Sequence, residues 1–208
     1  FYKLEAATCR VRLLICRDYS SAGYSTQSLP TRRLITAVKQ SLPETGPLRI
    51  NVSDVSLAHQ PMLAGIKHCN RLENILIRQQ SQALGYDESL LLDHDGRVIE
   101  CTAANIFALR ANELITPKLS KAGVAGVMRD FILTEVADSL GLSVSESIIE
   151  LPELFEAEAL FVSSAIRGVS PVSELVSEQR QHQWGVNERV KKIQQKIFDS
   201  MTVSYTHL

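Results

Sequence analysis

The sequence lacks the features that mark membrane proteins and nucleic-acid-binding proteins. No apolar run in its 208 residues approaches the roughly 20 residues that a membrane-spanning helix needs. The formal net charge is only −1, so neither a nucleic acid nor an anionic membrane surface is indicated as a partner. We therefore expect no membrane partner and no nucleic-acid partner.

Cysteine is scarce, and histidine follows no metal-binding pattern. The four cysteines have neither the spacing of metal ligands nor the density of a secreted disulfide scaffold: Cys9, Cys16, Cys69 and Cys101. The five histidines show no ligand spacing either: His59, His68, His94, His182 and His207. The sequence therefore predicts reduced thiols, a cytoplasmic protein and no metal site.

Internal repeats and low-complexity tracts are also absent, which leaves the composition of an ordinary soluble protein. Apolar residues make up 45% of the chain and charged residues 22%. The length fits one large domain or two modest ones. Residues 41–47 (SLPETGP) are punctuated by proline and glycine, and they predict a connection between two domains.

Hydrophobic periodicity and turn residues predict strands and helices in a mixed order. We expect strands at residues 10–17, 31–38, 48–57, 88–93, 97–101, 102–109, 113–115, 142–149 and 159–164. We expect helices from residue 72 to about Gly85, and at residues 124–140, 151–157 and 185–201. A hairpin turn is predicted at Asp93-His94-Asp95-Gly96.

The stretch LAGIKHCNRLE, residues 63–73, carries one lysine toward a predicted helix. Pro61 and Gly65 keep the residues before Lys67 out of the helix. Small and apolar neighbours at such a junction can desolvate an ammonium, lower its pKa and free the amine as a nucleophile. The alternative is an ordinary surface lysine. A helical period follows at Leu72, Ile75, Leu76 and Leu84.

Two later stretches add groups that suit a bound anion or ring. Glu100 ends a predicted strand and precedes small residues, which leaves room for a flat ligand. Gly123 and Gly126 come before a helix, where glycines let the backbone approach an anion and free N–H groups bind it. The alternatives are an exposed edge-strand glutamate and an ordinary helix start.

Lys67, Glu100 and the turn at residues 123–129, in this order and spacing, resemble the pyridoxal-phosphate enzymes of fold type IV, the class IV aminotransferase-like family. That family includes branched-chain and D-amino-acid aminotransferases and aminodeoxychorismate lyases. The lyase branch resembles the chain most, from about Arg17 to about Val172. The matching motifs are AGIKH (64–68), NRLE (70–73), EC (100–101), AAN (103–105), and AGV (122–124) with Gly126, Met128 and Arg129.

The resemblance implies an α+β fold of two domains, D-amino-acid aminotransferase-like, with pyridoxal 5'-phosphate at their interface. Residues 1–42 would be an incomplete N-terminal α/β domain, 43–47 a linker and 48–201 the C-terminal cofactor-binding domain. Residues 202–208 match nothing in the family and are interpreted as a non-native tail. The chain opens on Phe1 without a signal peptide, and we expect it to be a fragment. Family members are homodimers, so a homodimer is expected.

The resemblance also implies roles for individual residues. Lys67 would bind the cofactor aldehyde and move protons, and Glu100 would hold the pyridine nitrogen protonated. The N–H groups of Val124 and Ala125, with Ser164, would bind phosphate.

Four further residues lie next to these segments or in a loop of the incomplete domain. Asn105, Asn70 and Arg71 would orient the cofactor hydroxyl or substrate carboxylates, and Tyr24 would line the substrate site. The alternative is that Arg71 and Asn105 are structural, that Asn70 caps the helix, and that Tyr24 lies in a plain surface loop.

The implied activity is that of a carbon–oxygen lyase acting on a small molecule. It would convert 4-amino-4-deoxychorismate to 4-aminobenzoate and pyruvate in folate biosynthesis. The alternatives are a branched-chain or D-amino-acid aminotransferase of the same fold and an inactive fragment. The run HCNRL (68–72) favours the lyase, because aminotransferases commonly carry a tyrosine near Arg71. Two positions depart from the family: Ala22, where arginine is common, and Ala125, where many aminotransferases have threonine.

Overall fold

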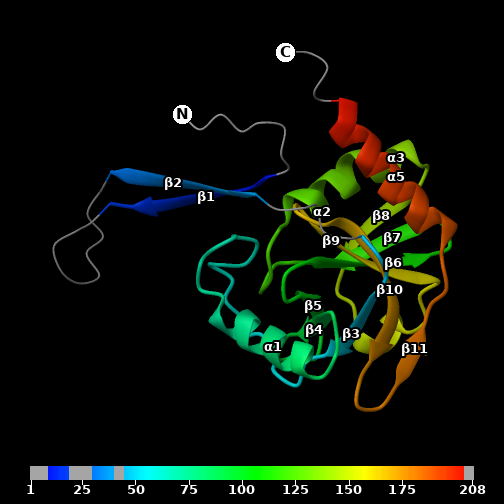
Figure 1. Cartoon of the computed structure of the whole chain (residues 1–208). Coiled ribbons are helices and arrows are strands. Elements are labelled where there is room, and N and C mark those ends of the chain that lie inside the picture. The colour runs from blue at the N-terminus through cyan, green and yellow to red at the C-terminus, as the bar shows by residue number, and fades with distance from the viewer. Residues whose placement is uncertain (1–8, 19–29, 40–44, 204–208) are drawn as a thin grey trace. The chain divides into compact units, whose positions relative to one another are not determined.

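The structure is a computed structural model that describes residues 9–18, 30–39 and 45–203 (Figure 1). The chain divides into two compact units, residues 1–43 and 44–208. In the described part of the first unit, β1 (Cys9–Arg17) pairs antiparallel with β2 (Thr31–Lys39) along their whole length. Both strands were predicted. Tyr24 lies outside the described residues, so its predicted role stays a prediction.

The second unit is built on a mixed sheet, which has nine strands among the described residues. Eight of them follow the order β5-β4-β3-β10-β9-β6-β7-β8, and β11 pairs with β10. Their bounds are β3 Leu48–Val52, β4 Glu88–Leu92, β5 Val98–Cys101, β6 Asn105–Arg110, β7 Glu113–Pro117, β8 Ser143–Ser147, β9 Ala159–Ser164, β10 Gly168–Val176 and β11 Gln181–Gln183.

Alternating side chains give the sheet a core on each face. Phe107 of β6 and Phe161 of β9 face the helices, and their stacked rings lie 4.8 Å apart. Ile106 and Val162, one residue along the same strands, belong to the core on the opposite face. The buried runs predicted at 102–109 and 159–164 are therefore central strands packed on both faces.

The helices of the second unit cover different parts of the sheet (Figure 1). Their bounds are α1 Leu72–Ala83, α2 Val127–Phe131, α3 Ala137–Ser139, α4 Leu151–Leu154 and α5 Glu188–Val203, and a π-helical turn, Ile132–Val136, joins α2 to α3. The segment from α2 to α3 packs with α5 over β6 and β9. Helix α1 packs Ile77 against Leu91 and Ile99 of the β4–β5 hairpin. None of the helices in the described ranges is long and apolar enough to cross a lipid bilayer.

Helix α1 begins at Leu72 and is followed by Gly85 at φ 84°, both as predicted. The apolar residues Leu72, Ile75 and Leu76 are more than half exposed. The buried residues are Asn74, Ile77 and Ser81. The apolar stripe therefore does not form the buried face of the helix, because the inward face contacts polar groups of β4 and of the turn after β5.

The predicted helix at 124–140 begins three residues later, at Val127. Gly65 explains the delay: its N–H donates to the Gly123 carbonyl at 2.9 Å, and its carbonyl accepts from the Ala125 N–H at 3.0 Å. These two bonds hold residues 123–125 extended beside residue 65. The helical segment that follows ends before Gly141, which has the positive φ of 66° expected of a helix terminator.

Two strand predictions also need correction. Strand β3 ends at Val52 rather than at residue 57, because the Ser53 hydroxyl bonds the N–H and carbonyl of Val55 and forms a turn. Strand β10, which pairs with both β3 and β9, was not predicted. Pro171 lies within it, and a proline ordinarily argues against a central strand. It is tolerated because β10 pairs with β3 only from Val172 onward.

Candidate active site

One cavity of about 370 Å³ brings together most of the residues that the sequence singled out. Its wall is made by the start of α1, the turn between β5 and β6, the turn before α2 and the end of β9. The predicted site residues that line it are Lys67, Arg71, Glu100, Asn105, Val124, Ala125 and Ser164. Asn70 instead lines an adjoining cavity that also contacts Arg71.

Lys67 lies in the long segment 53–71 between β3 and α1. It is exposed, so the expected desolvation by apolar neighbours is wrong for this structure. Gly65, two residues earlier, has φ +79° and makes the two hydrogen bonds to the turn at 123–125. That pairing brings the lysine segment and the glycine turn, which are far apart in sequence, to the same cavity.

Glu100 is the buried acid of the cavity, with 3% of its surface exposed. Its Oε1 accepts a hydrogen bond from Arg71 Nη2 at 2.8 Å, and its Oε2 accepts one from the Val124 N–H at 2.8 Å. Burial raises the pKa of Glu100 above its ordinary value, and the charge and hydrogen bond of Arg71, the Val124 N–H and the Lys67 charge oppose that rise. A carboxylate with two donors and a neighbouring ammonium is well placed to take one more N–H.

Arg71 has a different partner from the one predicted. It is the N-cap residue of α1, and no side chain caps the helix, so the alternative in which Asn70 is the cap is wrong. Its guanidinium bonds Glu100, and 21% of the side chain is exposed. Arg71 therefore stabilises the buried acid, and its predicted role with a substrate carboxylate is not what this geometry favours.

The N–H groups of Val124 and Ala125 are both used within the protein. The first donates to Glu100 and the second to the Gly65 carbonyl. Their predicted role in phosphate binding stays a prediction, and N–H groups without an acceptor in the described part of the chain are found at the residues that follow. Among the described residues, no group accepts from the N–H of Val127 or Met128, which open the continuous helical segment 127–139. Such first-turn N–H groups attract anions.

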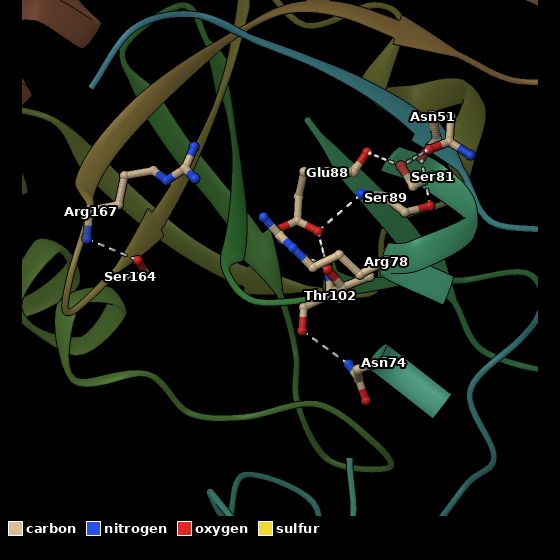
Figure 2. Close-up of polar contacts among 9 residues, drawn as sticks. All are labelled: Asn51, Asn74, Arg78, Ser81, Glu88, Ser89, Thr102, Ser164 and Arg167. Atoms are coloured by element: carbon tan, nitrogen blue, oxygen red, sulfur yellow. Dashed lines mark hydrogen bonds and ion pairs between the residues drawn. The ribbon is translucent and has the colours of Figure 1, made fainter. Parts of the chain in front are cut away.

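Asn105 and the serines complete this end of the cavity. Asn105 Nδ2 donates to the Val124 carbonyl at 2.8 Å, and a Cβ on Gly126 would lie 2.3 Å from its Oδ1. Asn105 thus supports the turn before α2, and Gly126 makes room for it. Ser163 is 1% exposed and its Oγ has no partner among the described residues, whereas Ser164 Oγ accepts from the Arg167 N–H at 3.2 Å (Figure 2).

Sequence reasoning missed three polar residues of the cavity wall: Asn74, Arg78 and Thr102. Asn74 and Arg78 are four residues apart on α1 and so share one face of the helix. In the sequence these two positions lie between the apolar positions of the helix. The signal was present as a second, polar stripe at the same helical spacing.

The chain is similar to known proteins in sequence and in fold. The family model described as amino-transferase class IV matches residues 2–175. The chain is 29% identical over 198 residues to an aminodeoxychorismate lyase of Vibrio harveyi, covering 92% of this chain and 72% of that protein. It is 28% identical over 137 residues to the branched-chain-amino-acid aminotransferase of Escherichia coli K12, covering 64% and 42%.

A solved structure of the 4-amino-4-deoxychorismate lyase from Pseudomonas aeruginosa superposes with a TM-score of 0.83 at 32% identity. The match covers 91% of this chain and 70% of that one. The predicted α+β architecture of fold type IV is therefore confirmed, as is the predicted family. The chain belongs to the class IV aminotransferase family.

Proposed function

We propose that this chain is the greater part of a pyridoxal-phosphate lyase that converts 4-amino-4-deoxychorismate to 4-aminobenzoate and pyruvate. The observation that carries the proposal is that Lys67 and the buried Glu100 line one cavity with the start of the helical segment 127–139. The similarity to the lyases of Vibrio harveyi and Pseudomonas aeruginosa supports the choice of reaction.

The residues present fit pyridoxal phosphate. The cofactor needs an amine for its aldehyde, an acceptor for its pyridine N–H and donors for its phosphate. The amine is Lys67 and the acceptor is Glu100, and the donors are the N–H groups of Val127 and Met128. The hydroxyl of Ser163, which has no partner among the described residues, is one more donor. A cavity of about 370 Å³ is within the usual range for small-molecule sites.

When bound, pyridoxal phosphate supplies an electron sink that stabilises negative charge developing on the substrate. Glu100 keeps that sink effective when it is ionised, and the charge of Arg71 and the Val124 N–H favour the ionised form against the effect of burial. Each carboxylate oxygen of Glu100 accepts one hydrogen bond within the protein, so each has a further lone pair available for the pyridine N–H. The electrostatic part of the reaction is thereby assigned to residues on β5 and α1.

Lys67 has two roles in the proposed reaction. Its amine would hold the cofactor through the cofactor aldehyde. The same amine would act as the base that removes the ring proton at the carbon that carries the substrate nitrogen. The carbon–oxygen bond to the enolpyruvyl group then breaks, the ring becomes aromatic, and Lys67 returns a proton to the departing enolpyruvate, giving pyruvate.

The second candidate is an aminotransferase for branched-chain or D-amino acids, which the similarity to the Escherichia coli aminotransferase favours. The run HCNRL (68–72) distinguishes the two, since aminotransferases commonly carry a tyrosine near Arg71. The test uses the full-length protein, in an assay for pyruvate beside a transamination assay with 2-oxoglutarate. We expect 4-aminobenzoate with pyruvate. Efficient half-transamination by leucine or D-alanine without 4-aminobenzoate would establish the aminotransferase instead.

A homodimer and a cytoplasmic location remain predictions from the family resemblance. Sedimentation velocity on the full-length protein checks the first, with a dimer as the expected species. Fractionation of the source cells checks the second, with the protein expected among the soluble proteins of the cytoplasm.

A further inference from the structure

Arg71 is bonded to Glu100, so a substrate carboxylate in this cavity needs another cation. Arg78, seven residues along the same face of α1, also lines the cavity. Figure 2 shows its guanidinium against the β4–β5 hairpin, with Nη1 2.5 Å from Glu88 Oε2 and 3.3 Å from Thr102 Oγ1. Arg78 is thus fixed on one side by protein partners.

Glu88 is the anchor behind Arg78. It is 4% exposed, and its Oε1 accepts from the Ser89 N–H at 3.0 Å, from the Thr102 N–H at 3.1 Å and from the Thr102 hydroxyl. Its Oε2 is left for Arg78. The carboxylate is therefore immobile and fully hydrogen-bonded, so the guanidinium is held in place before any ligand arrives, which reduces the entropy lost on binding.

The other edge of the guanidinium is free. Nε and Nη2 of Arg78 have no acceptor within the described part of the chain, and 30% of the side chain is exposed. Nε–H and Nη2–H lie on one edge of the planar group, which is the arrangement that binds both oxygens of a carboxylate.

Asn74, one turn before Arg78, gives an independent sign that this wall meets a polar ligand. It is 4% exposed, and its Nδ2 donates to the Thr102 carbonyl at 3.2 Å, which fixes the orientation of the amide. Its Oδ1 is buried in the cavity wall without a partner among the described residues. A buried acceptor left open is costly unless a ligand or a water completes it.

We propose that Arg78 is a specificity-determining residue that binds a carboxylate of the substrate through Nε and Nη2, with Glu88 and Thr102 as its positioning residues. The proposal rests on the proposed function in so far as that substrate carries carboxylates besides its amine. It assigns the role once predicted for Arg71 to a residue with free donors.

The test compares two probes on the full-length holoenzyme by calorimetry: 4-aminobenzoate, which has a carboxylate, and aniline, which lacks one. We expect the unaltered protein to prefer 4-aminobenzoate, and Arg78→Met to reduce that preference about 10- to 100-fold. Arg78→Lys keeps the charge but loses the paired donors, so its preference should be intermediate. Aniline affinity and the absorbance of bound cofactor should be unchanged in both variants.

Arg78→Met leaves Glu88 buried without its cation, which lowers the stability of the variant. The double variant Arg78→Met/Glu88→Gln removes the buried charge as well and should show the same loss of preference in a stable protein. Arg189→Met, on α5, is the matched control and should keep the full preference.

An unchanged ratio of the two affinities in both Met variants would overturn the proposal, as would equal losses for the two probes, which indicate a structural role. The readout is binding and not turnover, so it is independent of the proposed reaction. A protein that makes no 4-aminobenzoate but loses its preference in Arg78→Met refutes the proposed reaction and keeps the carboxylate site.

Discussion

Glu100 is a buried acid whose ionisation depends on its neighbours. Burial raises its pKa, and Arg71 opposes that rise through its charge and its hydrogen bond. Without Arg71 the pKa of Glu100 rises further, so a higher pH is needed to keep it ionised. We therefore predict that Arg71→Met moves the acid limb of the pH profile of kcat/KM to higher pH.

The control for Arg71→Met is Arg71→Lys, which keeps a positive charge near Oε1 and should move the acid limb less. Both variants are measured on the full-length holoenzyme across the acid range. An acid limb that stays in place in Arg71→Met would mean that Glu100 is not the group whose ionisation limits turnover.

Lys67 is the second residue with a direct test. It is exposed and makes no hydrogen bond among the described residues, so Lys67→Ala should fold normally and keep its circular dichroism spectrum. The variant should lose the absorbance of the covalently bound cofactor and its turnover. Borohydride reduction of the unaltered protein followed by peptide mapping locates the attachment. A cofactor adduct on Lys118 or Lys121 would rule out Lys67.

The sequence predicted which residues line the cavity better than it predicted their partners. Lys67 and Glu100 could be identified because the motifs that carry them have the order and spacing seen in the family that the chain resembles. The bond between Arg71 and Glu100 could not, because it joins side chains 29 residues apart. Its existence depends on where α1 packs against the β4–β5 hairpin, which no local pattern specifies.

At the scale of elements, the turn at Gly123 holds the lysine segment and Glu100 together. Gly123 has φ +87°, and a Cβ there would lie 2.8 Å from Leu119 Cδ2, 2.9 Å from Ile99 Cγ2 and 3.3 Å from Glu100 Oε2. We predict that Gly123→Ala lowers the free energy of unfolding by roughly 1–3 kcal/mol more than strain alone, because these side chains must move. Urea unfolding measures the loss, and cofactor affinity should fall with it.

Gly96→Ala is the matched control for Gly123→Ala. Gly96 has a similar φ of +78°, but a Cβ there would meet nothing within 4 Å. The Gly96→Ala variant therefore has the backbone strain without the steric contacts, and we expect its cofactor affinity to be unchanged. Equal losses of stability in the two variants would show that the close packing at Gly123 contributes nothing.

Element positions were predictable where a local rule decides them. Gly85 and Gly141 end helices, and the Asp93–Gly96 turn joins β4 to β5, as glycine and turn chemistry require. The orientation of α1 was not predictable from periodicity. Its polar face turns inward because Glu88 and Thr102 offer partners there, and these become neighbours only after β4 and β5 have paired.

At the scale of the whole molecule, the fold type could be predicted because several separated motifs agreed with one family. The order of the strands could not be derived from the chain itself. Strand β3 lies between β4 and β10, which are separated from it in sequence by α1 and by most of the second unit. The pairing of β10 with β3 is of this non-local kind, whereas β9 and β10 form a local hairpin. Strand β10 was missed because its sequence contains Pro171, which ordinarily argues against a central strand.

The hairpin that carries Glu100 also contains a group that should govern acid stability. Asp93 is 2% exposed; its Oδ1 accepts from the N–H groups of Asp95 and Arg97, each at 2.9 Å, and its Oδ2 lies 2.9 Å from His59 Nε2. Burial raises the pKa of Asp93, but these hydrogen bonds outweigh it, and the pKa in the folded protein is lowered.

A lowered pKa means that Asp93 stabilises the fold at any pH above its unfolded value of about 3.9, and that this stabilisation is lost as the pH falls through the folded value. We predict that Asp93→Asn lowers the free energy of unfolding by about 1–3 kcal/mol at neutral pH, because the backbone donors lose a charged acceptor. The difference in free energy of unfolding from the unaltered protein should shrink below about pH 4.

Urea unfolding at several pH values measures this difference. The control is Asp138→Asn, at an exposed position, which we expect to change stability by less than about 0.5 kcal/mol. A difference that stays constant down to pH 3 would mean that the Asp93 carboxylate is not ionised differently in the folded and unfolded chains.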